Sequence, residues 1–162
     1  MKAKVFMTRL GWMAAASNEE GVCAVIPPDG RRKVESKITD LAGGCWSSSP
    51  LLERLSRDIN RYLSGRRVDF KRYRTAPLNA TDFRLKVWST VRRIPYGSTA
   101  TYGGLAETIG CGDASRAVGG ALNANRLPII IPCHRVVSSK GLGGFSAGSD
   151  LKRELLILEG AI

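Results

Sequence analysis

Stretches of apolar and polar residues give the start of the chain the pattern of a β-hairpin. Residues 5–13 and 22–26 are mostly apolar, and a polar break at 17–21 separates them. Runs of this length bounded by turn-forming residues are typical of paired strands. Residues 27–30, Pro-Pro-Asp-Gly, end the second run. We therefore expect a two-stranded hairpin, whereas residues 31–48 carry no pattern that predicts an element.

A helix is predicted next. Ser49 offers an N-cap and Pro50 suits the first helical position, and Gly65 stands where the helix would end. Between them runs an apolar stripe at helical spacing, formed by Leu52, Leu55, Ile59, Tyr62 and Leu63. This helix is expected to pack on the hairpin. The basic segment 66–79, which contains Pro77, is expected to form a short strand and then a linker.

The second half of the chain reads as helical. Thr81 can cap a helix that Pro95-Tyr96-Gly97 stops, and its core face would be formed by Phe83, Val87, Trp88, Val91 and Ile94. Residues 101–109 and 113–124 predict two helices that a Gly-Cys-Gly turn separates, the spacing of a helix-turn-helix. A last helix is expected over 149–158, with Ser149 as its N-cap and Gly160 just after its end.

These elements predict an α+β fold in two domains. The first, residues 1–77, combines a small antiparallel sheet with a helix. The second, residues 78–162, is mostly helical and contains the helix-turn-helix and the cysteine discussed below. Its second helix carries mainly small residues around Arg116, so it could approach a nucleic-acid groove closely.

The charge balance favours a polyanionic partner. The 162 residues include 25 Lys and Arg against 14 Asp and Glu, a formal net charge of +11. Nucleic acid is the leading candidate. A membrane surface is the other polyanion, but the sequence has no long apolar run to support attachment. Arg9 interrupts the apolar stretch at the N-terminus, so no leader is expected and the protein is predicted to be cytoplasmic, on the nucleoid when bound to DNA.

The four cysteines do not predict a metal site. Cys23, Cys45, Cys111 and Cys133 lack Cys-x-x-Cys spacing, and the single histidine, His134, cannot complete the usual zinc sets. A disulfide between Cys23 and Cys45 is conceivable, but sequence does not establish the geometry.

The pair Cys133-His134 is the candidate for chemistry. It follows three isoleucines and Pro132, which predicts that residues 129–137 form a buried strand ending at a site. A histidine can act as the base for a cysteine nucleophile. The alternative is an inert buried cysteine, because neighbours in an extended strand point to opposite faces.

The flanking motifs point to a family. The resemblance depends on the order and spacing of six motifs. These motifs are Thr101-Tyr102-Gly103-Gly104-Leu105-Ala106, Ser115-Arg116-Ala117-Val118-Gly119-Gly120-Ala121-Leu122, Asn125 with Pro128, Pro132-Cys133-His134-Arg135-Val136, Gly143-Gly144-Phe145-Ser146-Ala147-Gly148 and Glu154 to Gly160. Residues 82–160 thereby resemble the active domain of the O6-alkylguanine-DNA alkyltransferases, which are single-turnover DNA-repair proteins. The resemblance also implies an RNase H-like N-terminal domain.

The resemblance implies specific catalytic roles. Cys133 would take the alkyl group from guanine O6, or from O4 of an alkylated thymine, in an irreversible step. His134 would act as its base through a water, and Glu159 would hold the imidazole tautomer. Tyr102 would crowd a phosphate, help rotate the nucleotide outward and donate to purine N3, while Arg116 would fill the gap in the base stack.

Other residues would bind the nucleotide or support the site. Ser146 would donate toward O6, and the carbonyls of Val136 and Cys133 would accept from the exocyclic amine. Ala114, Ser115 and Arg135 would contact DNA, and the side chain of Asn125 would tie backbone turns together. The implied partner is double-stranded DNA, bound in the minor groove by a monomer that could bind cooperatively. No cofactor is implied. Some members carry zinc in the N-terminal domain, but this sequence lacks the histidines for it.

Three other functions fit part of the pattern. An alkyltransferase-like protein would bind lesions without reacting, although such proteins replace the cysteine that Cys133 supplies here. A Cys-His hydrolase unrelated to DNA would leave the +11 charge unexplained. A purely architectural basic protein would bind DNA without chemistry.

Overall fold

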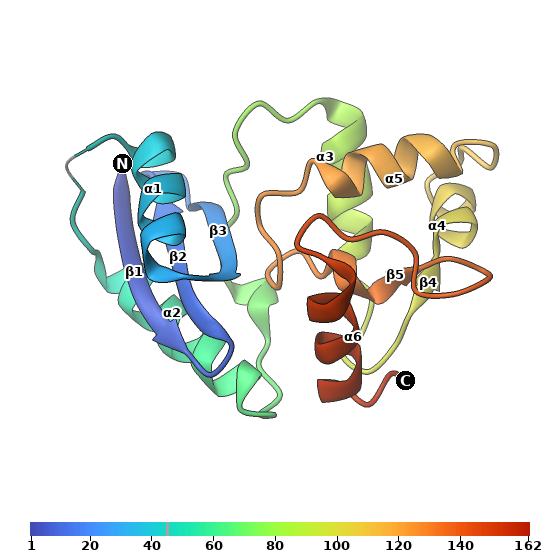
Figure 1. Ribbon diagram of the computed structural model, residues 1–162. Coiled ribbons are helices and arrows are strands. Elements are labelled where there is room, and N and C mark those ends of the chain that lie inside the picture. The colour runs from blue at the N-terminus through green and yellow to red at the C-terminus, as the bar shows by residue number, and fades with distance from the viewer. Residues whose placement is uncertain (45) are drawn as a thin grey trace. The chain divides into compact units, whose positions relative to one another are not determined.

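The computed structural model describes residues 1–44 and 46–162, and it confirms the α+β fold class (Figure 1). The chain forms two compact units, Met1–Leu78 and Asn79–Ile162. The boundary lies one residue later than the predicted one, which followed residue 77. The suggested pairing of Cys23 with Cys45 lies outside the described residues. Within the described ranges, every helix is too short or too polar to cross a membrane.

The first unit begins with three antiparallel strands, not the predicted two. They are β1 (Lys2–Thr8), β2 (Gly11–Ser17) and β3 (Val22–Asp29), in the order β1-β2-β3. The expected single strand over 5–13 is therefore wrong, because the chain reverses after Thr8. The Thr8 hydroxyl donates to the Gly11 carbonyl at 2.8 Å and accepts from Leu10 N at 3.2 Å. Gly11 has a φ of 122°, which other residues rarely adopt.

Two helices cover opposite faces of this sheet (Figure 1). Helix α1 (Arg31–Ala42), which no sequence pattern indicated, buries Val34 and Ile38 in a cluster with Ala14 and Ala16 of β2. Helix α2 (Pro50–Leu63) follows the predicted pattern, and Ser49 Oγ accepts from Leu52 N at 3.3 Å as its N-cap. All five residues of its predicted stripe are buried.

The segment after α2 contains no strand, so the short strand expected within 66–79 is wrong. It forms a 3-10 turn, η1 (Phe70–Arg72), and a single bridge between Thr75 and Val22 of β3. Buried Tyr73 fixes it to α2, because the Tyr73 hydroxyl donates to the carboxylate of Asp58. The Tyr73–Asp58 hydrogen bond and the single bridge thus hold this segment, in place of the series of backbone hydrogen bonds that a strand would make.

The second unit has the predicted helices. Helix α3 (Asp82–Val91) is capped by Thr81, whose hydroxyl accepts from Arg84 N at 3.3 Å. Trp88 of α3 donates from Nε1 to the Ala121 carbonyl at 2.8 Å. The remaining elements are β4 (Ala100–Thr101), α4 (Tyr102–Thr108), α5 (Ser115–Asn123), η2 (Cys133–Arg135), β5 (Val136–Val137) and α6 (Ser149–Leu158).

Helices α4 and α5 contact each other and form the expected helix-turn-helix pair. Strands β4 and β5, which each have two residues, pair in parallel. The N-terminus of α6 differs from the prediction: Gly148 is the N-cap, Ser149 is already helical, and no side chain caps this end. The short β4–β5 pair places the start of α4 beside the segment that carries Cys133.

Candidate active site

The segment that carries the cysteine is a buried turn and not the predicted strand. Residues 128–130 form a turn, Ile131 is in a bend, and η2 follows Pro132. Of the predicted strand 129–137, only Val136–Val137 forms one, as β5. Ile129 has a φ of 73°, a left-handed conformation that is unusual for a β-branched residue. Such a conformation persists only where surrounding contacts over-determine it. The three isoleucines are buried as expected, but their β propensity does not decide the backbone.

Asn125 supplies the contacts that hold this turn. Its Oδ1 accepts from Leu127 N at 2.9 Å, and its Nδ2 donates to the Ile131 carbonyl at 3.1 Å. The same Nδ2 lies 3.1 Å from the sulfur of Cys133. The backbone N of Cys133 donates to the Ile131 carbonyl at 2.7 Å. Asn125 therefore supports the turn, as the family resemblance implied, and its amide also contacts the thiol, which the resemblance did not imply.

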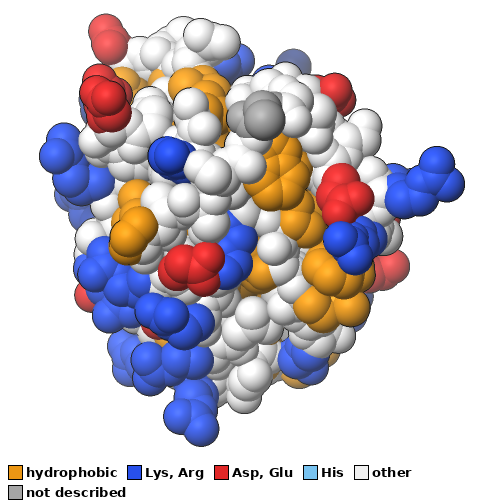
Figure 2. All heavy atoms as spheres, turned by 90° about the vertical axis from the view of Figure 1, so that its left-hand side faces the viewer, with side chains coloured by type: hydrophobic (Ala, Val, Ile, Leu, Met, Phe, Trp, Pro, Cys, Tyr) orange, Lys and Arg blue, Asp and Glu red, His pale blue; other side chains and the backbone are white. Residues whose placement is uncertain are grey.

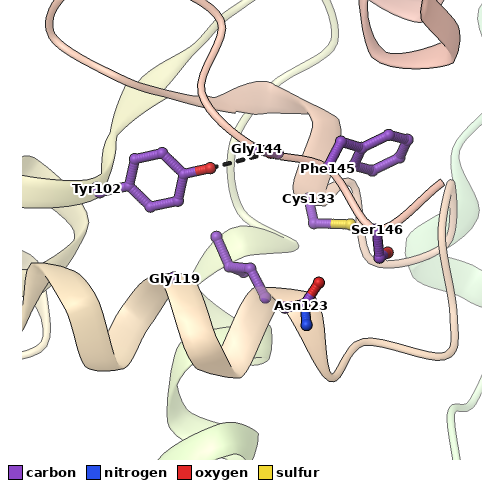
Figure 3. Close-up of a pocket in the computed structure, with 8 residues that line it drawn as sticks. Tyr102, Gly119, Asn123, Cys133, Gly144, Phe145 and Ser146 are labelled. Atoms are coloured by element: carbon purple, nitrogen blue, oxygen red, sulfur yellow. Dashed lines mark hydrogen bonds between the residues drawn. The ribbon is translucent and has the colours of Figure 1, made fainter. Parts of the chain in front are cut away.

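Cys133 lies on a cavity of about 240 Å³ (Figure 3). Its side chain points into the space that α5 and the glycine-rich loop 143–148 enclose. The lining residues are Tyr102, Gly119, Leu122, Asn123, Cys133, Gly144, Phe145 and Ser146. Sites for drug-sized ligands measure about 300–1,000 Å³. This smaller cavity suits a single ring system with a small substituent.

The thiol is protonated in the resting protein. Burial raises the pKa of Cys133 to about 11, although the hydrogen bond from Asn125 acts in the opposite direction. The reactive form of a cysteine is the thiolate. A base must therefore take the thiol proton when a reaction begins.

Glu159 organises the groups next to the cysteine. Its Oε1 lies 2.8 Å from His134 Nε2, and the guanidinium of Arg135 donates to both its oxygens, each at 2.9 Å. The backbone N of Gly97 donates to Oε2 at 3.1 Å. Arg135 also donates from Nη1 to the Ile94 carbonyl at 2.7 Å. The arginine fork and these further donors favour the ionised carboxylate.

This network sets the state of His134. Burial is the main cause that lowers the pKa of His134 below 6.5, so its imidazole is neutral near pH 7. A carboxylate can only accept, so Nε2 carries the proton toward Glu159 and Nδ1 keeps the basic lone pair. The ring of Phe145 packs edge-on against the imidazole, with centroids 6.5 Å apart. A neutral, oriented histidine is what a general base requires.

The structure places Arg135 away from the surface role that the sequence analysis gave it. It was expected to contact DNA, but it is buried and its guanidinium binds Glu159 and the Ile94 carbonyl. The carbonyl of Val136, expected to accept from a guanine amine, already accepts from the ammonium of Lys152 at 2.6 Å. A carbonyl oxygen has two lone pairs and can accept a second hydrogen bond, so acceptance from a guanine amine stays a prediction.

Lys152 is the functional residue that sequence reasoning missed. It is fully buried, and its ammonium donates to the carbonyls of Val136 and Gly144 and lies 5.8 Å from the ring centroid of Tyr102. Burial lowers its pKa to about 8. On α6 it stands among leucines at a position that reads as solvated, and no sequence signal separates it from a surface lysine.

Tyr102 closes the cavity opposite the cysteine (Figure 3). Its hydroxyl donates to the Gly144 carbonyl at 3.1 Å, and burial raises its pKa. A Cβ on Gly143 would come within 2.8 Å of the Tyr102 ring, and Gly143 has a φ of 72°. The close approach of loop and ring therefore requires glycine at position 143.

The expected DNA-contacting residues lie on a neighbouring surface. Arg116 is exposed on α5, one turn before Gly119 of the cavity. A shallow open depression is lined by Thr101, Tyr102, Gly103, Ser115, Arg116, Ser138 and Ser139. Tyr102 belongs to both the depression and the cavity. Ala114 is the residue before α5, beyond the lining of either.

Comparison with known proteins places the chain in a family. The family model for the 6-O-methylguanine DNA methyltransferase DNA-binding domain matches residues 82–161. A methylated-DNA–protein-cysteine methyltransferase of Methanosarcina acetivorans is 38% identical over 159 residues, 97% of each chain. The chain belongs to the 6-O-methylguanine DNA methyltransferase family. Another relative with that protein name, from Sulfolobus acidocaldarius, is 36% identical over 96% of this chain and 91% of its own.

Membership covers both units of the chain. The crystal structure of Mycobacterium tuberculosis OGT in complex with DNA has a TM-score of 0.80 and 29% identity to this protein. That match covers 99% of this chain and 93% of the other. The resemblance drawn from the motifs is therefore confirmed. The family's members are enzymes of DNA repair that transfer an alkyl group to a cysteine.

Proposed function

We propose that this protein repairs DNA by rotating an O6-alkylguanine out of the duplex and transferring its alkyl group to Cys133. The single observation that carries the proposal is the buried thiol on a base-sized cavity beside the His134–Glu159 pair. The family membership supports the reaction class. The cavity supports a single nucleobase as the group that enters.

The reaction is a displacement at the alkyl carbon. The Cys133 proton passes to His134 Nδ1 through a water, and the thiolate attacks. The bond between carbon and guanine O6 breaks as the bond between carbon and sulfur forms. The departing guanine takes a proton, for which the Tyr102 hydroxyl at the cavity wall is the donor, and Tyr102 recovers one from the imidazolium or solvent. The thioether at Cys133 is stable, so each molecule reacts once, without a cofactor.

Extruding a base costs a few kcal/mol of stacking and pairing. Arg116, exposed one helical turn from the cavity, is the side chain that would fill the vacated position in the stack. The small residues of α5 would let that helix lie in a minor groove. Minor-groove patterns discriminate bases poorly, which suits a protein that must act at a lesion in any sequence.

Mass spectrometry of the intact protein tests the proposal. The wild-type chain is incubated with a duplex that contains O6-methylguanine, beside the Cys133→Ser variant. We expect wild-type protein to gain one methyl group in place of hydrogen, mapped by peptides to Cys133, and the lesion to become guanine. Cys23 and Cys111 serve as internal control thiols that stay unmodified.

Two outcomes would contradict the proposal. Methylation at Cys23 or Cys111 in place of Cys133 would show that the cavity does not direct the reaction. Binding that prefers the damaged duplex with no change in mass would indicate a lesion-binding protein without transfer.

A further inference from the structure

The first unit carries a concentration of positive charge that the proposed reaction does not use. Residues 54–74 contain eight cations and two acids. The cations are Arg54, Arg57, Arg61, Arg66, Arg67, Lys71, Arg72 and Arg74, and the acids are Asp58 and Asp69. All eight cations are exposed, whereas the Asp58 side chain is only 5% exposed. We call these eight side chains the basic ridge.

The basic ridge is one surface because α2 and the segment after it are fixed together. The carboxylate of Asp58 accepts from both Arg72 and Tyr73, and Arg61 Nη1 lies 3.7 Å from it. The guanidinium carbons of Arg54 and Arg72 each lie 5.5 Å from the centroid of the Tyr73 ring. Arginines from two parts of the chain therefore meet around one buried pair, Asp58 and Tyr73.

Helical spacing extends the surface along α2. Arg54, Arg57 and Arg61 stand at i, i+3 and i+7, which places them on one face of the helix. That face lies opposite the buried stripe. Figure 2 looks onto this unit and shows a dense group of Lys and Arg side chains low on the face, at the height where Figure 1 draws the end of α2.

Helix α1 of the same unit has no such surplus. Arg31 pairs with Glu35 at 2.7 Å, and Lys33 and Lys37 lie 3.5 and 3.6 Å from the carboxylate of Asp29. Three of the four cations on α1 thus have a carboxylate partner nearby, as on an ordinary solvated helix. The basic ridge, in contrast, has two acids for its eight cations: buried Asp58, which lies near Arg61 and Arg72, and exposed Asp69.

We propose that the basic ridge is a second DNA-binding surface that contacts the phosphate backbone of a duplex. Seven of its eight cations are arginine, whose planar fork binds phosphate in a bidentate manner. Stacking on Tyr73 and pairing with Asp58 hold three of the arginines, so less side-chain freedom is lost on binding. Contacts of this kind position a protein on DNA and carry no sequence information.

The surface chemistry favours DNA over a lipid membrane. Peripheral attachment needs apolar side chains that insert, in addition to basic ones. Among the described residues, the large apolar side chains that are exposed are Met1, Met7, Leu85, Ile157 and Ile162, all outside residues 54–74. The basic ridge offers charge without an inserting group.

Binding of the full-length protein to an undamaged duplex at several salt concentrations tests the proposal. The ridge variant is Arg57→Ala, Arg66→Ala and Arg74→Ala, which leaves the Asp58–Tyr73 cluster intact. Its matched control removes three exposed cations from α1 by Arg32→Ala, Lys33→Ala and Lys37→Ala. Both variants lose the same charge from the same unit.

The ridge variant should bind with a weaker dependence on salt. The slope of log K against log salt concentration changes by about 0.9 for each phosphate that the protein no longer neutralises, so we expect a slope smaller by roughly 2 to 3. We expect roughly tenfold weaker affinity at physiological salt, against little change in the α1 control. With damaged duplex at saturation, the rate of alkyl transfer should equal the wild-type rate.

Several results would overturn the proposal. Equal losses in both variants would mean that net charge alone matters, and unchanged binding by the ridge variant would mean that DNA does not touch this surface. A loss of binding to anionic phosphatidylserine vesicles, with DNA binding unchanged, would assign the surface to membranes. Because the binding assay uses undamaged DNA, its result is independent of whether Cys133 reacts.

Discussion

Glu159 accepts four hydrogen bonds, three of them from buried donors, so its replacement by glutamine tests whether its negative charge holds the site together. In the Glu159→Gln variant one carboxylate oxygen becomes an NH2 group, which cannot accept. Each oxygen of Glu159 accepts from two donors: Oε1 from His134 and Arg135, and Oε2 from Arg135 and Gly97. Whichever oxygen is replaced, the new NH2 group therefore points at two groups that can only donate to it. The guanidinium of Arg135, whose side chain is 10% exposed, then keeps its charge without a counter-ion.

The size of the effect follows from that buried charge. Breaking one partner of a buried ion pair costs about 3–5 kcal/mol. Proteins are stable by about 5–15 kcal/mol, so the loss is a large share of the total. With a urea dependence of about 1–3 kcal/mol per molar, the unfolding midpoint should fall by roughly 2 M. Transfer should also slow by about 10²–10⁴-fold, because the imidazole loses the acceptor that fixes its tautomer.

A double variant separates these two effects. Arg135→Met combined with Glu159→Gln removes both charges, and replacing a buried pair by neutral groups is often close to neutral for stability. We expect the urea midpoint to recover most of the loss, whereas the transfer rate, measured on fully folded protein, should stay low.

Either of two results would refute this reasoning. If Glu159→Gln unfolds at the wild-type midpoint, the carboxylate does not balance the Arg135 charge. If the double variant recovers the transfer rate together with stability, Glu159 acts on the reaction only by holding the fold together.

Two further predictions concern the cavity and its base. Gly143→Ala should displace Tyr102 and slow the transfer of the alkyl group. Gly148→Ala is the control, because Gly148 also has a positive φ, 95°, but open space around its Cβ, so this variant shows the effect of backbone strain alone. Equal transfer rates in the two variants would show that the Tyr102 contact is unimportant. The folded pKa of His134 lies below 6.5, so the unfolded chain binds more protons as pH falls below about 6.5 and stability decreases. Urea unfolding from pH 7.5 to 5 should show this decrease, and His134→Gln should remove most of it; an equal decrease in the variant would assign it to other groups.

Local signals predicted the helices wherever cap and stripe agreed. Ser49-Pro50 before α2 and Thr81 before α3 each preceded an apolar stripe, and both helices form as expected. Helix α1 was missed because it buries only Val34 and Ile38, and because its N-cap residue is Gly30, which has no side chain to cap the helix. Its place is set by packing on the sheet, a contact that a local pattern does not contain.

The strand predicted at residues 129–137 forms only at its end, Val136–Val137, for a related reason. β propensity describes how a residue fits a pleated, half-buried surface, and Ile129–Ile131 are buried without a partner strand. The amide of Asn125 takes the place of a ladder by binding Leu127 N and the Ile131 carbonyl. Sequence placed Asn125 near the site through the family resemblance, but the turn itself depends on side-chain geometry that spacing does not encode.

Three buried polar side chains around the cavity bind backbone carbonyls, and this explains why the sequence identified the reacting residues better than the contacts that support them. Asn125, Arg135 and Lys152 each donate to backbone carbonyls, of Ile131, of Ile94 and of Val136 and Gly144. A side chain that donates to a carbonyl has its partner in the backbone, so the sequence shows no complementary side chain that would reveal the contact. The bonds of Lys152 join α6 to β5 and to the glycine-rich loop 143–148, and the bond of Arg135 joins η2 to the residues after α3. These contacts exist before a substrate binds, so part of the entropic cost of positioning the site is met during folding and less during binding.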